Sequence, residues 1–179
     1  MLDWFQPLQD IRDFLEAGGY VLWVIFGVSL LLWALIFERY WFLRREYPLL
    51  LKHEVELWKQ RGDTKSWHAH KIREAMISSM GIKLSRSLLL IRTLVSLCPL
   101  LGLLGTVSGM IRVFDVMSIM GTGNVRAIAS GVSMATIPTM AGLVTALSGF
   151  YFSVRLNHHA IVARQTMADR IRDYGGVTQ

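Results

Sequence analysis

The chain has 179 residues, of which 53% are hydrophobic, and its formal net charge is +6 at pH 7. A water-soluble domain would spread its apolar residues along amphipathic elements, whereas here they are concentrated in three uncharged blocks, residues 17–37, 93–111 and 127–154. Each block provides the roughly 20 residues that a helix needs to cross a hydrocarbon core of about 30 Å. This excludes a soluble protein and predicts an all-α integral membrane protein with three transmembrane helices.

The N-terminal segment, residues 1–18, is predicted to be a short amphipathic helix on the outer surface of the membrane, because its apolar residues recur at helical spacing. Acidic residues outnumber the single basic residue there, Arg12. A secretory signal begins with a basic region instead. The first apolar block is therefore expected to be retained as a transmembrane helix over residues 19–40, with aromatic residues toward both ends, as at membrane interfaces: Tyr20, Trp23, Trp33, Tyr40 and Trp41.

Residues 41–87 are predicted to form a helical loop. Apolar residues at helical spacing indicate one helix over residues 49–58 and a second that begins near Trp67, with a break at residues 61–63. Lysine and arginine gather in this loop and after residue 154. Because basic residues stay on the cytoplasmic side, the N-terminus is expected outside and the C-terminus inside. The net charge is thus a topology signal, and no nucleic-acid partner is expected.

The second span is predicted over residues 88–118 and the third over residues 126–155. A periplasmic turn, residues 119–125, joins them, and a cytoplasmic C-terminal helix, residues 156–179, follows. Both spans are rich in small residues, which let helix backbones approach closely in lipid, and each contains a proline, which removes one backbone hydrogen bond. The predicted packing and kink positions are Pro99, Gly102, Gly105, Gly109, Gly131, Ala135, Pro138 and Gly142. Both spans are expected to face protein, and the first span is expected to face lipid.

Two threonines in these spans, Thr106 and Thr139, are the candidate functional residues. Their hydroxyls could form a weakly polar lining beside a proton or ion route. The alternative is that each hydroxyl bonds back to a carbonyl of its own helix. At the outer end of the second span, Arg112 and Asp115 are three residues apart, which favours an ion pair along the helix.

The residues do not support an enzyme. The sequence contains no readable nucleophile–base pair, phosphate loop or carboxylate pair, and the five histidines and single cysteine lack the spacing of a metal site. Neither a metal nor a cofactor is expected. A proton route normally needs an ionisable group such as a carboxylate or a histidine inside the membrane, and no Asp, Glu or His lies in the three apolar blocks. If the chain conducts protons, a partner must therefore supply the carboxylate.

The second and third spans resemble the ExbB/TolQ/MotA proton-channel family. Residues 99–111 read Pro-Leu-Leu-Gly-Leu-Leu-Gly-Thr-Val-Ser-Gly-Met-Ile, which looks like the signature of the family's second helix. Residues 128–133, Ile-Ala-Ser-Gly-Val-Ser, together with Thr139 and Gly142, look like the third. The short length and the run from Met134 to Gly142 are most similar to ExbB-type proteins of second TonB systems.

This resemblance implies a scaffold or stator subunit of a proton-motive-force-driven motor in a Gram-negative inner membrane. Five copies would surround a dimer of an ExbD-like single-span partner, whose transmembrane Asp carries the proton. Thr106 and Thr139 match the positions that face that Asp. The complex would energise a TonB-like protein that drives outer-membrane import.

The sequence also departs from the family pattern, and these departures leave alternatives open. Relatives commonly have a glutamate at the position of Met134 and a proline at that of Ser148. Without that glutamate, a proton route would rely on the partner's Asp, water and hydroxyls. The alternatives are a TolQ-like motor for envelope integrity and a non-conducting membrane scaffold. A MotA-like flagellar role would be expected to bring a large cytoplasmic domain, which the chain lacks.

Overall fold

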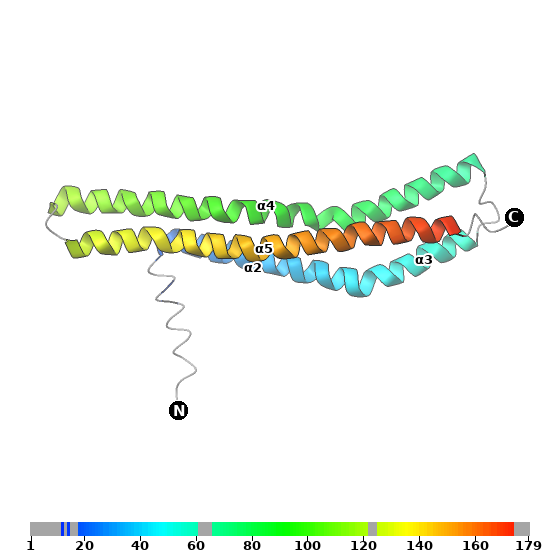
Figure 1. Ribbon diagram of the computed structural model, residues 1–179, viewed down its shortest axis with the longest axis horizontal. Helices are drawn as coiled ribbons and strands as arrows, with labels where there is room; N and C mark the ends of the chain where they lie inside the picture. Colours follow the sequence, from blue (N-terminus) through cyan, green and yellow to red (C-terminus); the bar gives the residue numbers. More distant parts are fainter. Residues whose placement is uncertain (1–11, 13, 15–17, 61–65, 122–124, 174–179) are drawn as a thin grey trace, which may run out of the picture. The chain divides into compact units, whose positions relative to one another are not determined.

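The computed structural model describes residues 12, 14, 18–60, 66–121 and 125–173. Every element in these residues is helical: α2 (Gly19–Trp41), the π-helical turn η1 (Phe42–Glu46), α3 (Tyr47–Lys59), α4 (Trp67–Met120) and α5 (Val125–Asp173) (Figure 1). Three of the helices are long and apolar enough to span a membrane. The prediction of an all-α membrane protein with three transmembrane helices is therefore confirmed.

Two glycines mark helix ends through their backbone conformation. Gly19 begins α2 with φ of 69°, and Gly121 follows α4 with φ of 72°. The N–H of Gly121 donates to the carbonyl of Met117 at 2.9 Å, which is the αL arrangement that ends many helices. Glycine favours both positions because it adopts positive φ without a Cβ clash.

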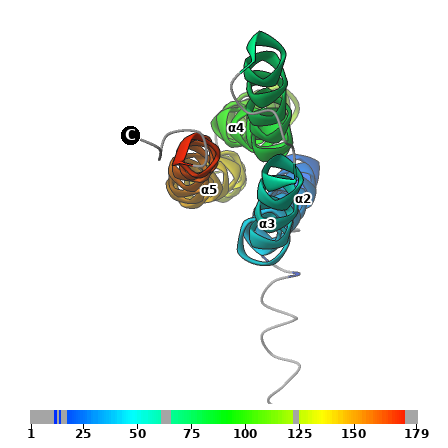
Figure 2. The same cartoon turned by 90° about the vertical axis from the view of Figure 1, so that its right-hand side faces the viewer.

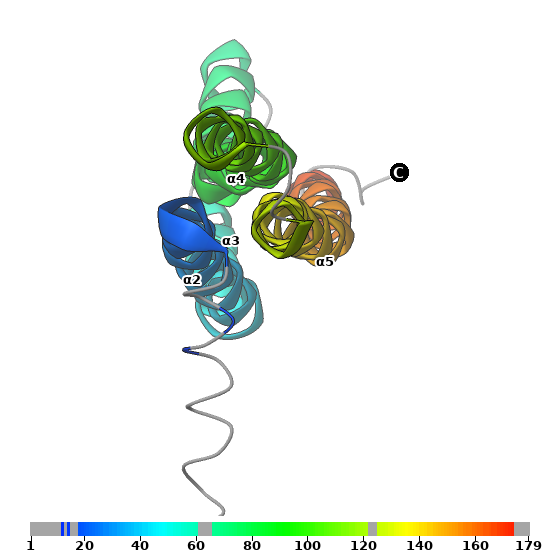
Figure 3. The same ribbon diagram turned by 90° about the vertical axis from the view of Figure 1, so that its left-hand side faces the viewer.

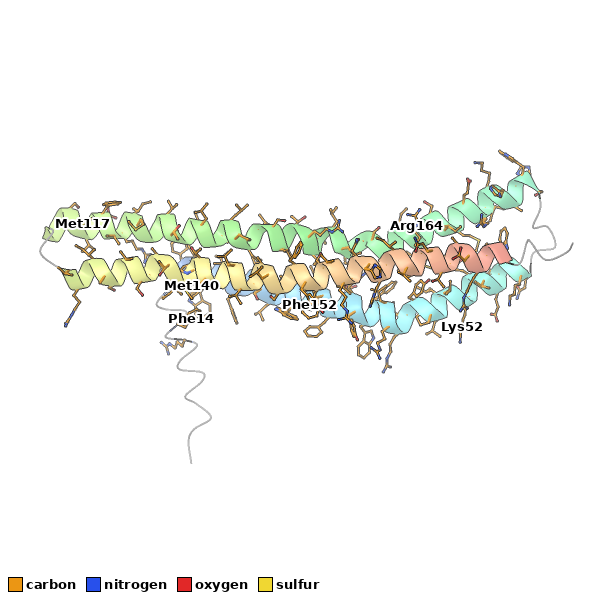
Figure 4. The ribbon with its side chains drawn as sticks, in the orientation of Figure 1. Phe14, Lys52, Met117, Met140, Phe152 and Arg164 are labelled. Carbon is orange, nitrogen blue, oxygen red and sulfur yellow. The ribbon has the colours of Figure 1, made fainter. Side chains whose placement is uncertain are left out.

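The chain folds as two compact units. The first contains Met1–Trp33 and Thr93–Phe150, and the second contains Ala34–Arg92 and Tyr151–Gln179. In the first unit, α2, α4 and α5 lie side by side and are seen end-on in Figure 3. Its buried residues recur every three or four positions along α4 and α5, so each helix presents one continuous stripe to the other: Val95, Cys98, Gly102, Gly105, Gly109 and Val113 on α4, and Ala135, Pro138, Gly142, Ala146 and Gly149 on α5.

The second unit is seen end-on in Figure 2. Several large side chains are buried in its interior. They include Trp58 of α3, Leu84 of α4 and Met167 of α5. Arg39 is 2% exposed, and its Nη2 donates to the carbonyl of Lys83 at 2.8 Å while the guanidinium lies 4.7 Å from the ring centroid of Phe42. Small residues thus dominate where α4 meets α5 in the first unit, whereas the second unit also buries bulky side chains between its helices.

The large helices run farther than the separate predicted segments. Both α4 and α5 include a predicted span and the adjoining predicted cytoplasmic helix, because no proline lies where either span meets the charged residues and α4 continues through Gly81. The second unit contains α3 and the start of α4, where two loop helices were expected. The predicted break at residues 61–63, the tip of the outer turn, and nearly all of the N-terminal amphipathic segment lie outside the described residues.

Candidate functional site

The candidate site is the contact between α4 and α5 in the first unit. Glycines along this contact allow the two helix backbones to lie close together. A Cβ added to Gly109 would lie 2.6 Å from both Cα and Cβ of Ala135, and one added to Gly142 would lie 2.6 Å from the carbonyl oxygen of Cys98. Gly105 lies directly against the ring of Pro138. Each position therefore has no room for a side chain unless the helices separate.

Four more of the predicted packing residues lie along this contact: Gly102, Gly131, Ala135 and Pro138. A Cβ on Gly102 would be 3.0 Å from the Cα of Thr139, Gly131 lies directly against the side chain of Val113, and Ala135 is 3% exposed. Pro99 and Pro138 are both inside their helices, and Pro138 is fully buried. The two spans thus meet through backbone and small side chains, the arrangement that favours helix association where lipid supplies no hydrophobic drive.

Thr139 joins the two helices through a hydrogen bond. Its Oγ1 donates to the carbonyl of Gly102 at 3.0 Å, from a half-buried position. By contrast, Ser108 of α4 and Thr136 of α5 donate to carbonyls three residues earlier in their own helices. The hydroxyl of Thr139 therefore lies within the close α4–α5 contact.

Thr106 behaves differently. Its Oγ1 donates to the carbonyl of Leu103 at 2.7 Å, so the hydrogen bond stays within α4. This is the alternative in which the hydroxyl bonds back to a carbonyl of its own helix. Thr106 lies four residues after Gly102, one helical turn along the same face. Thr106 is thus one helical turn along α4 from the residue whose carbonyl Thr139 contacts, and both hydroxyl hydrogens are donated to backbone carbonyls.

Arg112 does not form the ion pair with Asp115 that its spacing favoured. Among the described residues, its Nη1 contacts Sδ of Met134 on α5 at 3.4 Å, and its guanidinium lies 5.9 Å from the ring centroid of Tyr20 on α2. A cavity of about 10 Å³ lies here, lined by Ser108, Gly109, Arg112 and Met134 among others. The guanidinium thus turns across the helices toward a sulfur atom, which is only a weak acceptor.

The sequence alone could not place these contacts, because they depend on the register of α4 against α5. Hydroxyls of threonine can bond to a neighbouring helix or to their own, and sequence spacing does not distinguish the two. Within the described residues, no group of three or more histidine, cysteine, aspartate or glutamate side chains is placed to hold a metal ion.

The helices and their small-residue contact define a polytopic membrane protein. Among the described residues, the α4–α5 contact carries threonine hydroxyls and no carboxylate. The chain belongs to the MotA/TolQ/ExbB proton channel family, whose model matches residues 46–168. It is 30% identical to a Synechocystis protein described as biopolymer transport protein ExbB-like 3, over 84% of this chain and 89% of that relative.

A second Synechocystis relative, described as biopolymer transport protein ExbB-like 1, is also 30% identical. The match covers 76% of this chain and 66% of the relative, so the chain spans just under two thirds of that protein. No solved structure matches the chain. Family membership supports a general proton-channel or stator-type role in a membrane.

Proposed function

We propose that this chain is the scaffold subunit of a proton-motive-force-driven motor in the inner membrane of a Gram-negative bacterium. It works with an ExbD-like single-span protein that supplies a transmembrane Asp, and its output energises a TonB-like protein for outer-membrane import. Copies of the chain form a ring, for which the family resemblance implies five members. The observation that carries the proposal is the hydroxyl of Thr139 at a close helix contact whose apolar blocks contain no carboxylate.

The direction of the threonine hydrogen bonds supports a role in sensing the partner's protonation. Both hydroxyl hydrogens are donated to backbone carbonyls, those of Gly102 and Leu103. The hydroxyl oxygens of Thr106 and Thr139 can then only accept a hydrogen bond from a side chain of the partner protein. A protonated carboxylic acid can donate to such an oxygen, whereas a carboxylate only accepts. In this state the pair favours the partner's Asp with its proton bound.

Loss of the proton would reverse this preference. To receive a carboxylate, a threonine must rotate its hydrogen away from the backbone carbonyl, which costs a hydrogen bond of about 0.5–1.5 kcal/mol. Moving one elementary charge through 100 mV releases about 2.3 kcal/mol. This energy exceeds the cost of losing one such hydrogen bond, so the membrane potential is large enough to drive the exchange between the two protonation states. The partner's Asp would therefore leave one subunit when it ionises and settle at the next when it is protonated again.

The test is proton flux through the purified complex in liposomes. The chain is co-expressed with a single-span, Asp-bearing partner and reconstituted, and flux is followed with an internal pH dye. Thr139→Ser keeps a hydroxyl and should retain most of the flux, whereas Thr139→Val should lose most of it. Equal flux in both variants, at equal complex yield, would contradict the proposal.

A second candidate, a non-conducting membrane scaffold, is favoured by Met134, which stands where family resemblance implies glutamate. Under that function the chain co-purifies without an Asp-bearing partner, and liposomes show no dye response with any variant. A TolQ-like output in envelope integrity keeps the same motor and changes only the energised protein. Identifying the proteins that co-purify with the complex separates these outcomes.

A further inference from the structure

A groove in the second unit is independent of the threonine site. Its volume is about 420 Å³. It lies between one wall, formed by η1 and the start of α3, and a second wall formed by the second half of α5. Residues that line it include Leu43, Tyr47, His158, His159, Val162 and Thr166. Tyr47 donates its hydroxyl hydrogen to the carbonyl of Ala163 at 2.6 Å, which holds the two walls together.

Two histidines line the groove, and two arginines lie close to its lining in the sequence. His158 and His159 are exposed, and Arg155 lies one helical turn before both of them on the same face of α5. Across the groove, Arg44 directly follows the lining residue Leu43. Among the described residues that line the groove, none is acidic. An imidazole ring donates one N–H when neutral and two when charged, so both histidines can bond an anion in either state.

Each wall carries the same tyrosine–arginine pair. Nη1 of Arg44 donates to the hydroxyl oxygen of Tyr40 at 2.7 Å, and Nη1 of Arg155 donates to that of Tyr151 at 3.2 Å. These intrahelical contacts restrain both guanidinium groups while leaving most of their N–H donors free to bind phosphate oxygens. Tyrosine is also a side chain that favours the membrane interface.

The groove lies at the depth of lipid headgroups. The first uncharged block ends at Phe37 and the third at Val154. At 1.5 Å per residue, Leu43 lies about 9 Å and His158 about 6 Å beyond those ends. The polar layer on each side of a bilayer is roughly 5–8 Å thick, so both walls reach the phosphate level of the leaflet on the basic side.

We propose that this groove binds the phosphate of an acidic phospholipid from the cytoplasmic leaflet. Arg155, His158 and His159 donate to the phosphate oxygens from α5, and Arg44 donates from the opposite wall. Leu43 and Val162 provide apolar surface for the glycerol backbone. The choice of leaflet follows from the excess of lysine and arginine on this side of the spans.

Native mass spectrometry of the full-length protein in detergent tests this site. Phosphatidylglycerol and phosphatidylcholine are added at equal concentration, and the fraction of protein carrying each lipid is compared. The wild type should favour phosphatidylglycerol at least fivefold. The triple variant Arg155→Gln, His158→Gln, His159→Gln should lose most of that preference, since each cation near an anionic headgroup is worth roughly fivefold in binding.

A matched control removes the same residue types elsewhere in the second unit. The variant Arg86→Gln, His68→Gln, His70→Gln changes three exposed residues outside the groove lining and should keep the wild-type preference. Arg155→Lys alone, which retains the charge, should fall between the two variants. Circular dichroism and elution volume show whether each variant is folded.

Four outcomes would overturn the proposal. Equal uptake of the two lipids by the wild type would remove the case for an acidic headgroup. An unchanged preference in the folded triple variant would place the lipid elsewhere. Displacement of the lipid by millimolar inorganic phosphate would assign the groove to a free anion, and a changed oligomeric mass with unaltered lipid uptake would assign it to a second copy of the chain.

Discussion

Thr139 on α5 is hydrogen-bonded to the backbone carbonyl of Gly102 on α4, with 3.0 Å between Oγ1 and the carbonyl oxygen. Gly102 is also the residue whose missing side chain allows this approach, because a Cβ there would meet the Cα of Thr139 at 3.0 Å. The threonine and the glycine therefore depend on each other. A change at either position alters the distance between two helices as well as the polarity of the site.

We expect Thr139→Val to destabilise the folded chain modestly and Thr139→Ser to leave it nearly unchanged. Valine matches threonine in shape but leaves the Gly102 carbonyl without this donor, and such interhelical bonds in membranes are worth about 0.6 kcal/mol on average. Thermal unfolding in detergent measures the difference. A loss in the serine variant as large as that in the valine variant would show that packing of the methyl group, and not the hydroxyl, matters here.

Gly109→Ala should destabilise the α4–α5 contact by about 1–3 kcal/mol, the usual cost of forcing extra atoms into a packed interior. Gly27→Ala on α2 is the matched control, because a Cβ at Gly27 has no neighbour within 4 Å. It should be neutral or stabilising, since alanine is favoured over glycine in a helix by about 1 kcal/mol. Equal unfolding temperatures for the two variants would contradict the close packing.

Met134→Glu should create an ion pair with Arg112. The guanidinium nitrogen already lies 3.4 Å from the sulfur that the carboxylate would replace. Because Arg112 is exposed, the expected coupling is that of a surface pair, about 0.2–1 kcal/mol. A double-mutant cycle with Arg112→Gln measures this coupling free energy. Zero coupling would mean that the side chains do not pair and that the glutamate of relatives serves another purpose.

Arg39→Lys should destabilise the second unit more than Arg39→Met. Arg39 is buried, its Nη2 bonds to the carbonyl of Lys83, and its Nε has no hydrogen-bond partner. A lysine would bury a compact, strongly hydrated charge without the flat face that lies over Phe42. Methionine fills the space without any charge, and such replacements are often tolerated. Chemical denaturation in detergent ranks the two variants.

The sequence predicted the fold class because uncharged blocks and helical spacing depend on local composition. Small residues at helical spacing can also be read from the sequence of each span. In the structure, Gly109 and Gly142 lie where the two helix backbones approach each other closely. The sequence could not predict the partner of Thr139 or the turn of Arg112 toward Met134, since both depend on how two helices are aligned along their axes. The full length of α4 could not be predicted either. Hydropathy identifies the part of a helix that lies in lipid and does not show how far the helix continues outside it.

The π-helical turn between α2 and α3 has a consequence for the residues that follow it. The N–H of Tyr47 donates to the carbonyl of Phe42, five residues earlier, so this turn takes up one residue more than an α-turn would. One residue corresponds to about 100° of rotation around a helix axis. The phase of Leu51, Val55 and Trp58 is thus set by a single surplus residue in Phe42–Glu46. Deleting one residue there would rotate these three side chains by about 100° around the helix axis, away from the interior of the second unit.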